Sequence, residues 1–320
     1  MNKFLLLIIL FLFLGCKNNS AQVINENNTQ YINEDDTQYT KCINEADILY
    51  PKRKYHNNDT CWMYADRFGS VVLPDARNYY RIANPFSCGL ALVLDRDKKW
   101  KYIDKKGKVI IDASEYSMCW GFEEPIGPHA GGFKGLAYVS NWGETDEKFG
   151  FIDLNGRIAL PVDYDAILGA GDAYYPEYDK ILLIKKNGLY GAINEKTDII
   201  IPIQYDEMSV FIHGSALAKR KAHWGLINTK GETILPFTIL EIGQQCGNPI
   251  TSEMRYLVKK DKYWGIIDQK GKDIIPFIYT QWERYPDSDT IRLHKEDGSN
   301  ITWKIREDKL VTEYSEYTVK

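Results

Sequence analysis

The stretch Trp264-Gly-Ile-Ile-Asp-Gln-Lys-Gly-Lys-Asp-Ile-Ile-Pro276 decides the fold, because its pattern returns along most of the chain. The most similar copy is Trp224-Gly-Leu-Ile-Asn-Thr-Lys-Gly-Glu-Thr-Ile-Leu-Pro236. Copies with the same offsets begin at four further aromatic residues, which are Trp62, Trp100, Phe149 and Tyr190. Neighbouring starts lie 34 to 49 residues apart, and a degenerate last unit surrounds Trp303. Similarity at such a period indicates a protein built from stacked repeats.

Each fixed position of the repeat has a physical meaning. Asp or Asn occupies the fifth position in all six copies and is typical of the start of a type I turn. The following Gly, replaced only by Thr197, supplies the left-handed residue that closes a hairpin with a bulge. Gly after the aromatic, replaced by Met63 and Lys101, would allow a close backbone approach beneath the ring. The final Pro, replaced by Asp112, is expected to end the ladder or to mark an edge strand.

A further aliphatic run precedes most of the aromatic residues and predicts another strand. These runs are Leu90–Leu94, Leu136–Val139, Ile181–Ile184, Ala216–Ala218 and Tyr256–Val258. Each unit should therefore contain three or more short antiparallel strands, and the fold class is all-β. Stacked units form either a curved open array or a closed, propeller-like ring. The uneven spacing of the copies favours the open array.

The repeat resembles the WG-repeat family, named for the Trp-Gly pair at its start, over about 62–280. The resemblance implies an all-β repeat protein, often exported, with no established chemistry. The departures at Met63, Lys101, Asp112 and Thr197 weaken the first unit most. The residues that define the repeat in this chain are Trp62, Trp100, Phe149, Gly150, Tyr190, Gly191, Trp224, Gly225, Trp264 and Gly265.

The N-terminus predicts export and lipid attachment. A basic start, Met1–Lys3, precedes the apolar run Phe4–Leu14, which is too short to span a bilayer but suits a secretion signal. Gly15-Cys16 after this run resembles the bacterial lipobox, which implies cleavage before Cys16 and acylation of that residue, for example with palmitate. An ordinary signal peptide that contains a Cys, or an uncleaved anchor, is the alternative.

The expected organisation has three parts. These are a lipoprotein signal peptide at 1–15, lipidated Cys16 with a disordered polar tether at 16–45, and the WG-repeat β domain at 46–320. The tether is rich in Asn, Asp, Gln and Thr and contains two octads, at 24–31 and 32–39, that are nearly identical. Such a segment buries too little apolar surface to offset the entropy of ordering. We expect the mature protein in the bacterial cell envelope, periplasmic or surface-exposed, anchored in the lipid bilayer through Cys16.

Charge and cysteine content limit the classes of partner and site. The net charge of −4 comes from interspersed signs, without the basic block that nucleic-acid binding requires. Export permits disulfides. Of the five remaining cysteines, proximity favours pairs Cys42–Cys61 and Cys88–Cys119 and leaves Cys246, while buried free thiols are the alternative. No histidine spacing supports a metal site, and no motif implies a cofactor.

Candidate binding residues lie where the repeat is interrupted. We interpret the repeat tryptophans as core residues rather than as a carbohydrate-stacking surface, because their offsets from Ile and Gly are constant. The segment 112–148 is predicted to be a long loop insertion, and such loops commonly bind partners. Its candidate residues are Trp120, Glu123, Glu124, His129 and Trp142.

The sequence therefore favours a non-enzymatic binding scaffold for an envelope protein or glycan. Two alternatives remain: a self-assembling structural component of the envelope, and a hydrolase with an unrecognised site. Glu123, Glu124 and His129 are the closest approach to a catalytic cluster. Adjacent residues on a loop do not place two carboxylates several ångströms apart, as acid–base catalysis needs, so no catalytic residue is assigned.

Overall fold

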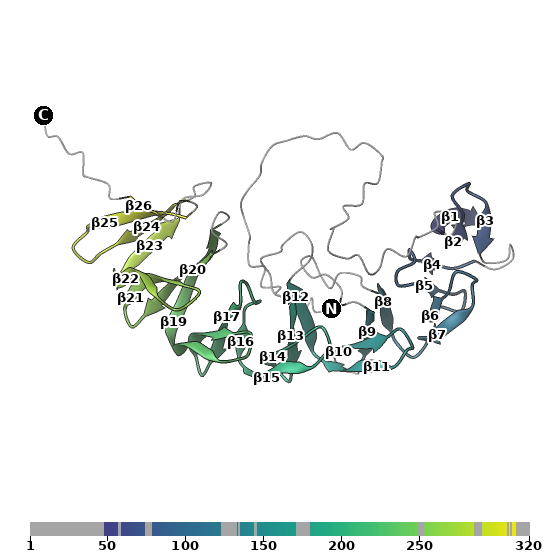
Figure 1. Ribbon diagram of the computed structural model, residues 1–320, viewed down its shortest axis with the longest axis horizontal. Helices are drawn as coiled ribbons and strands as arrows, with labels where there is room; N and C mark the ends of the chain where they lie inside the picture. The colour runs from purple at the N-terminus through teal and green to yellow at the C-terminus, as the bar shows by residue number, and fades with distance from the viewer. Residues whose placement is uncertain are drawn as a thin grey trace, which may run out of the picture.

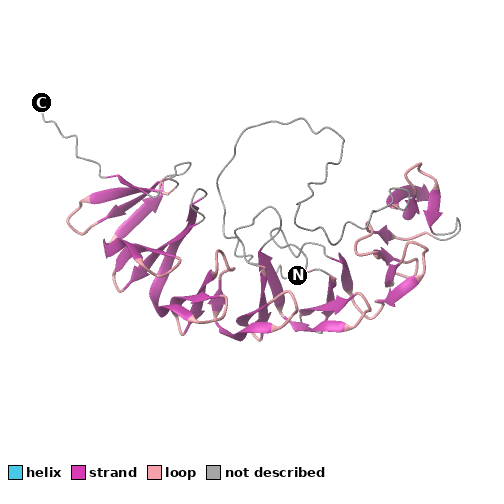
Figure 2. Ribbon diagram, in the orientation of Figure 1, coloured by secondary structure: helices cyan, strands magenta, loops and turns pink. Residues whose placement is uncertain are grey.

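The computed structural model describes the following residues: 48–56, 59–73, 79–122, 133, 135–143, 146–170, 180–248, 253–284, 290–305, 307 and 309–311. Across these ranges the chain forms strands, turns and irregular segments, and no helix occurs (Figure 2). Accordingly, no helix in the described part is long and apolar enough to span a membrane. The fold class is all-β, as the repeat pattern predicts.

The strands form seven units in chain order. The first unit has three strands, β1 (Tyr50–His56), β2 (Asp59–Ala65) and β3 (Val71–Leu73). The second unit has four strands, β4 (Ile82–Ala83), β5 (Ala91–Leu94), β6 (Trp100–Ile103) and β7 (Val109–Asp112). The third unit consists of β8 (Met118–Phe122), β9 (Leu136–Trp142), β10 (Glu147–Asp153) and β11 (Ile158–Tyr164). The fourth unit consists of β12 (Ala166–Ala170), β13 (Ile181–Lys186), β14 (Leu189–Ile193) and β15 (Ile199–Tyr205).

The fifth and sixth units share one long strand. The fifth contains β16 (Glu207–Met208), β17 (Ser215–Arg220), β18 (His223–Asn228) and the first half of β19 (Thr233–Asn248). The sixth contains the second half of β19, β20 (Glu253–Lys260), β21 (Tyr263–Asp268) and β22 (Asp273–Tyr279). The seventh contains β23 (Gln281–Arg284), β24 (Thr290–His294), β25 (Asn300–Lys304) and β26 (Lys309–Val311). All pairings are antiparallel, and the aliphatic runs singled out in the sequence lie in β5, β9, β13, β17 and β20.

The units follow one another along an open, curved array (Figure 1). The first and seventh units lie at opposite ends of the arc, so the array does not close into a ring. Adjacent sheets pack face to face and bury apolar side chains between them. Between the third and fourth units, for example, Phe151 and Leu160 pack against Ile184 and Ile193, all at most 3% exposed. Stability is thus shared between neighbours, as expected for a stacked repeat.

The turn between the third and fourth strands of a unit has the predicted conformation. In the third unit, the Asp153 carboxylate accepts hydrogen bonds from the backbone N–H of Asn155 and of Arg157, at 2.8 and 2.9 Å. Gly156 closes the turn with a φ of +75°. The equivalent side chains accept the same pair of bonds in five other units, namely Asp66, Asp104, Asn194, Asn228 and Asp268.

The repeat proline does not end its strand. Phe149 pairs with Tyr164, and Phe151 pairs with Leu160, so residues 161–163 bulge opposite Gly150. Because bulged residues leave the ladder, a proline without an N–H is tolerated there. The expected edge strand is found for Pro161 and Pro202, since β11 and β15 are the outer strands of their sheets. Pro236 lies in β19, an inner strand of its sheet, which pairs with β20 only from Ile239 onward.

Candidate interaction surface

The segment 112–148 is not a loop insertion, which corrects the sequence interpretation. It contains β8 and β9, the first two strands of the third unit, and these pair with each other and with β10. Met118 at the start of β8 lies opposite Ser140, and Phe122 at its end lies opposite Ala137. The run Leu136–Val139 is the predicted strand within β9, whereas β8 was not recognised; residues 123–132 lie outside the described part of the chain.

The two described candidates lie on neighbouring strands of one sheet, Trp120 in the middle of β8 and Trp142 at the end of β9. Trp142 lies at the end of β9 that joins β10, whereas the segment after Phe122 leaves the opposite end of β8. A strand as long as β9 separates these ends by about 20 Å. Glu123, Glu124 and His129 lie outside the described residues, so their role stays a prediction. Deleting 112–148 would remove two strands of the core rather than a loop.

Trp142 is the feature of this sheet that is most exposed to solvent, with 65% of its surface accessible. The backbone that carries it is held firmly. Its N–H donates to the Ser117 hydroxyl at 3.1 Å, and the Ser117 N–H donates to the side-chain carbonyl of Asn141 at 3.0 Å. On the other side, the Gly143 N–H donates to the Asp146 carbonyl at 2.7 Å. An exposed indole on a constrained backbone loses little entropy on binding.

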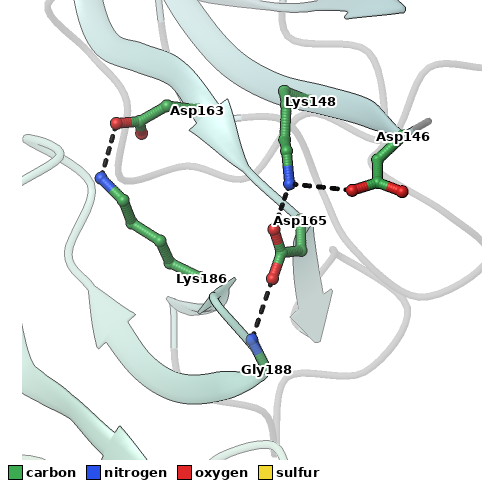
Figure 3. A network of polar contacts seen from close by, with 6 residues as sticks. All are labelled: Asp146, Lys148, Asp163, Asp165, Lys186 and Gly188. Carbon is green, nitrogen blue, oxygen red and sulfur yellow. Dashed lines mark hydrogen bonds and ion pairs between the residues drawn. The ribbon is translucent and has the colours of Figure 1, made fainter. Parts of the chain in front are cut away.

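Charged groups surround this hairpin on the side of the fourth unit (Figure 3). Lys148 extends from β10 to the Asp165 carboxylate at 2.6 Å and to Asp146 at 3.6 Å. The Asp165 carboxylate also accepts the Gly188 N–H at 3.0 Å, from the turn between β13 and β14. The Lys148 ammonium holds the pKa of Asp165 below its ordinary value, against the opposing effect of burial. The network fixes the third unit against the fourth.

A stack of half-buried rings lies farther along the same sheet. Trp120 of β8 packs edge-on against Tyr138 of β9, with ring centroids 4.7 Å apart. Tyr138 in turn stacks on Phe149 of β10, at 5.3 Å and nearly parallel. Burial raises the pKa of the Tyr138 phenol, so the ring stays neutral. Sequence reasoning singled out Trp120 but missed Tyr138, whose place on the same face becomes evident only once β8 and β9 are recognised as paired strands.

The repeat tryptophans are packed rather than displayed. Trp100 and Trp264 are each 8% exposed, and Trp62 and Trp224 are half-buried. The Lys259 ammonium lies over the Trp264 ring, 5.7 Å from its centroid, which further covers that face. These contacts agree with the core interpretation and disfavour a row of open tryptophans for sugar stacking.

The described cysteines do not supply a reactive centre. Cys119 carries a free, buried thiol, and burial raises its pKa to about 12, so it remains protonated and unreactive. The pairing of Cys88 with Cys119 is therefore wrong; Cys88 is exposed, whereas Cys119 is enclosed in the core between the second and third units. Cys42 lies outside the described residues, as does the side chain of Cys246. Within the described ranges, no group of three or more His, Cys, Asp or Glu side chains could hold a metal ion.

Comparison with known proteins supports the repeat assignment. The family described as "WG containing repeat" matches at residues 102–127, 149–190, 190–220, 224–242 and 264–285. The resemblance drawn from the sequence is thus confirmed: the chain carries WG repeats. The first unit and, apart from β23, the seventh unit fall outside these matches, although the structure shows a sheet in each. No curated protein matches the chain.

Two solved structures illustrate what the chain is similar to in outline. BamB from Moraxella catarrhalis is 11% identical, with 80% of this chain and 81% of that chain covered and a TM-score of 0.28. A eukaryotic initiation factor is 10% identical, with coverage of 81% and 82% and a TM-score of 0.33.

Proposed function

We propose that this WG-repeat chain is a lipid-anchored scaffold of the bacterial cell envelope that binds an envelope protein or glycan without catalysing a reaction. The observation that carries the proposal is the hairpin between β9 and β10. It presents Trp142, 65% exposed, on a backbone held by Ser117 and by the Gly143–Asp146 bond. Tryptophan on a rigid support is a frequent source of binding energy in protein interfaces, and its ring also stacks on sugars.

The polar surroundings of Trp142 suit a partner with mixed chemistry. Glu147 lies opposite Trp142 in the hairpin, and its carboxylate accepts the Ser140 hydroxyl at 2.6 Å. Lys148, the residue after Glu147 in β10, lies opposite Asn141 and therefore projects from the other face of the sheet. An apolar ring surrounded by donors and acceptors resembles the centre and rim of an ordinary interface.

The decisive experiment compares two exposed aromatic residues in the full-length chain. Trp142→Ala and the matched control Tyr50→Ala, at 49% exposure in the first unit, are used as baits for detergent-solubilised envelope and for isolated envelope polysaccharide. We expect a discrete protein or glycan to be retained by the wild type and by Tyr50→Ala but lost with Trp142→Ala. Equal retention by all three chains would remove Trp142 from the binding surface.

The anchor is tested separately. We expect mass spectrometry to find acyl chains on Cys16 and fractionation to place the wild type with membranes. In Cys16→Ala the modification should disappear. An unmodified Cys16 in membrane-bound protein would instead indicate an uncleaved N-terminal anchor.

The seventh unit bears on the alternative of self-assembly. The outer face of its sheet is polar: His294 lies 3.3 Å and Arg292 3.8 Å from the Glu283 carboxylate. A terminal repeat with a polar outer face caps an array and disfavours end-to-end growth. The scaffold proposal therefore takes precedence over a self-assembling component.

A further inference from the structure

Exposed aliphatic side chains recur at one position of the repeat, where the return strand leaves the D-x-x-G turn. The first residue of this strand is Val71, Val109, Ile158 and Ile199 in the first four units, with exposures of 46%, 43%, 63% and 53%. We call these four residues the aliphatic row. Exposed β-branched residues at a single repeat position are not explained by packing within the array.

The row is continuous from unit to unit. The turn of each unit contacts the return strand of the preceding one: a methyl group added at Gly156 would lie 2.8 Å from Ile111, and one added at Gly107 would lie 3.0 Å from Leu73. The Thr197 hydroxyl donates to the Ala159 carbonyl at 2.9 Å. Equivalent positions of adjacent repeats therefore lie side by side on one side of the array. In the fifth and sixth units Thr233 and Asp273 occupy the same position, so the row ends there.

Cations border the row along its length. The turns of the first four units carry Arg67, Lys105, Lys106, Lys108, Arg157 and Lys196, all exposed. Within the same segments, Asp66, Asp104 and Asp153 are occupied in holding their turns, and the exposed acids are Glu195 and Asp198. Phe68, 78% exposed, adds an aromatic ring at the first turn, with the Arg67 guanidinium 4.7 Å from its centroid. Counted with these five carboxylates, the six cations leave a net charge of +1, and the positive excess lies at the turn of the second unit.

We infer that the first four units contact an anionic lipid bilayer through the aliphatic row and its turn cations. Small apolar side chains at the boundary of the acyl region, with Lys and Arg at the level of the head groups, are the chemistry of interfacial membrane binding. Each side chain of the aliphatic row lies one repeat from the next. A bilayer offers the same environment to all four of them, because its surface is uniform. The inference is independent of Trp142 and of acylation at Cys16.

Hydrogen exchange of the full-length chain on vesicles tests the inference within one molecule. The probe is a vesicle of phosphatidylglycerol and phosphatidylcholine, compared with phosphatidylcholine alone and with chain in solution. We expect co-sedimentation with the anionic vesicles and several-fold slower exchange in segments 66–73, 104–111, 153–160 and 194–201. Segments 228–235 and 268–275, at the same repeat positions in the fifth and sixth units, should not change.

Matched variants complete the test. The double variant Ile158→Asp, Ile199→Asp should lose the slower exchange of segments 153–160 and 194–201 on anionic vesicles. Thr233→Asp should leave this protection intact. Removing one turn cation, as in Arg157→Ala, should weaken the contact about fivefold, since each cation near an anionic surface contributes roughly 1 kcal/mol. A chain that stays in solution, six segments that respond alike, or equal protection on neutral vesicles would each overturn the inference.

Discussion

The second and third units share a repeat but differ at the residue after the aromatic. In the third unit Gly150 lies beneath a bulge, because three residues of β11, 161–163, lie opposite this single residue of β10. In the second unit Lys101 pairs directly with Asp112, the last residue of β7, and the only register shift of this strand pair lies between Tyr102 and Ile103. The side chain of Lys101 then reaches the Asp95 carboxylate at 2.5 Å.

This difference shows that the glycine after the aromatic residue and the proline of the return strand belong to the same bulge. A methyl group at Gly150 would lie 2.6 Å from the Leu160 oxygen and 2.7 Å from the Pro161 oxygen, which is far inside contact distance. The bulge that contains the proline therefore requires the glycine. Where the second unit has Asp112 in place of Pro, no bulge lies opposite Lys101, and a long side chain is accommodated.

The largest effect is expected from Gly150→Ala. The added methyl group meets backbone rather than a flexible side chain, so the bulge must move, and we expect a loss of about 1–3 kcal/mol in the free energy of unfolding. Urea denaturation of the full-length chain, followed by tryptophan fluorescence, measures it.

Lys101→Ala provides the matched control in the second unit. Its Cβ is already present in the structure, so only the partly exposed pair with Asp95 is lost, at a cost below about 1 kcal/mol. If the two substitutions cost the same, the glycine requirement would not come from the bulge.

Much of this architecture could be predicted from the sequence, because local chemistry dictates it. The turn needs an acceptor at Asp153 and a left-handed residue at Gly156, and both are visible in the repeat. The bulge could not be predicted, since it depends on register between two strands. The first strand of most units was also missed: β12 and β16 are short edge strands without a distinctive pattern.

The candidate site was predictable only in part, for the same reason. Trp120 and Trp142 are conspicuous in the sequence, but a list of residues between 112 and 148 does not reveal that they lie on paired strands. Their positions follow from the register of β8, β9 and β10, which is a long-range property. The ring stack through Tyr138 likewise becomes evident only from the pairing of neighbouring strands. The aliphatic row becomes evident only from the packing of neighbouring units.

The third unit is joined to its two neighbours by different contacts. On the side of the fourth unit, Asp165 joins the units through Lys148 and the Gly188 N–H. At the corresponding corner before β8, the Ser117 carbonyl makes the link instead, by accepting the indole N–H of Trp100 from the second unit at 3.2 Å. Only the first of these links contains a titratable group, so only that boundary should respond to acid through its corner residue.

Asp165→Asn should have an intermediate and pH-dependent effect. The pKa of Asp165 is lowered in the folded protein, chiefly by the bond from Lys148. Its stabilisation is therefore complete above the ordinary value of 3.8 and is lost as the pH falls through the lowered value. We expect the variant to be less stable by about 1 kcal/mol at pH 7, after allowance for solvent screening, and the difference to shrink below pH ~3.

Urea midpoints of both chains at a series of pH values measure this linkage. Asp163→Asn is the control, since its bond to Lys186 is a similar ion pair but its side chain is 48% exposed. A difference between wild type and Asp165→Asn that stays constant down to pH ~2 would show that the carboxylate acts by shape rather than by charge.

The smallest effect is expected at two hairpin turns whose second left-handed residue is Gly in one and Ala in the other. The turn between β13 and β14 has Asn187 and Gly188 at φ of +53° and +81°, whereas the turn between β17 and β18 has Lys221 and Ala222 at +49° and +68°. Both are turns that require two left-handed residues, which alanine adopts only with strain. Ala222→Gly relieves that strain but adds flexibility to the unfolded chain, so a net gain of about 0.5 kcal/mol is expected.

The reciprocal substitution isolates the cause. No atom lies within 4 Å of a methyl group added at Gly188, so Gly188→Ala should destabilise through backbone conformation alone, by a similar amount of about 0.5 kcal/mol. Differential scanning calorimetry of the two variants should therefore show shifts in melting temperature of opposite sign. Shifts of the same sign would mean that the two turns differ in more than this residue, and that the units are less equivalent than their shared repeat implies.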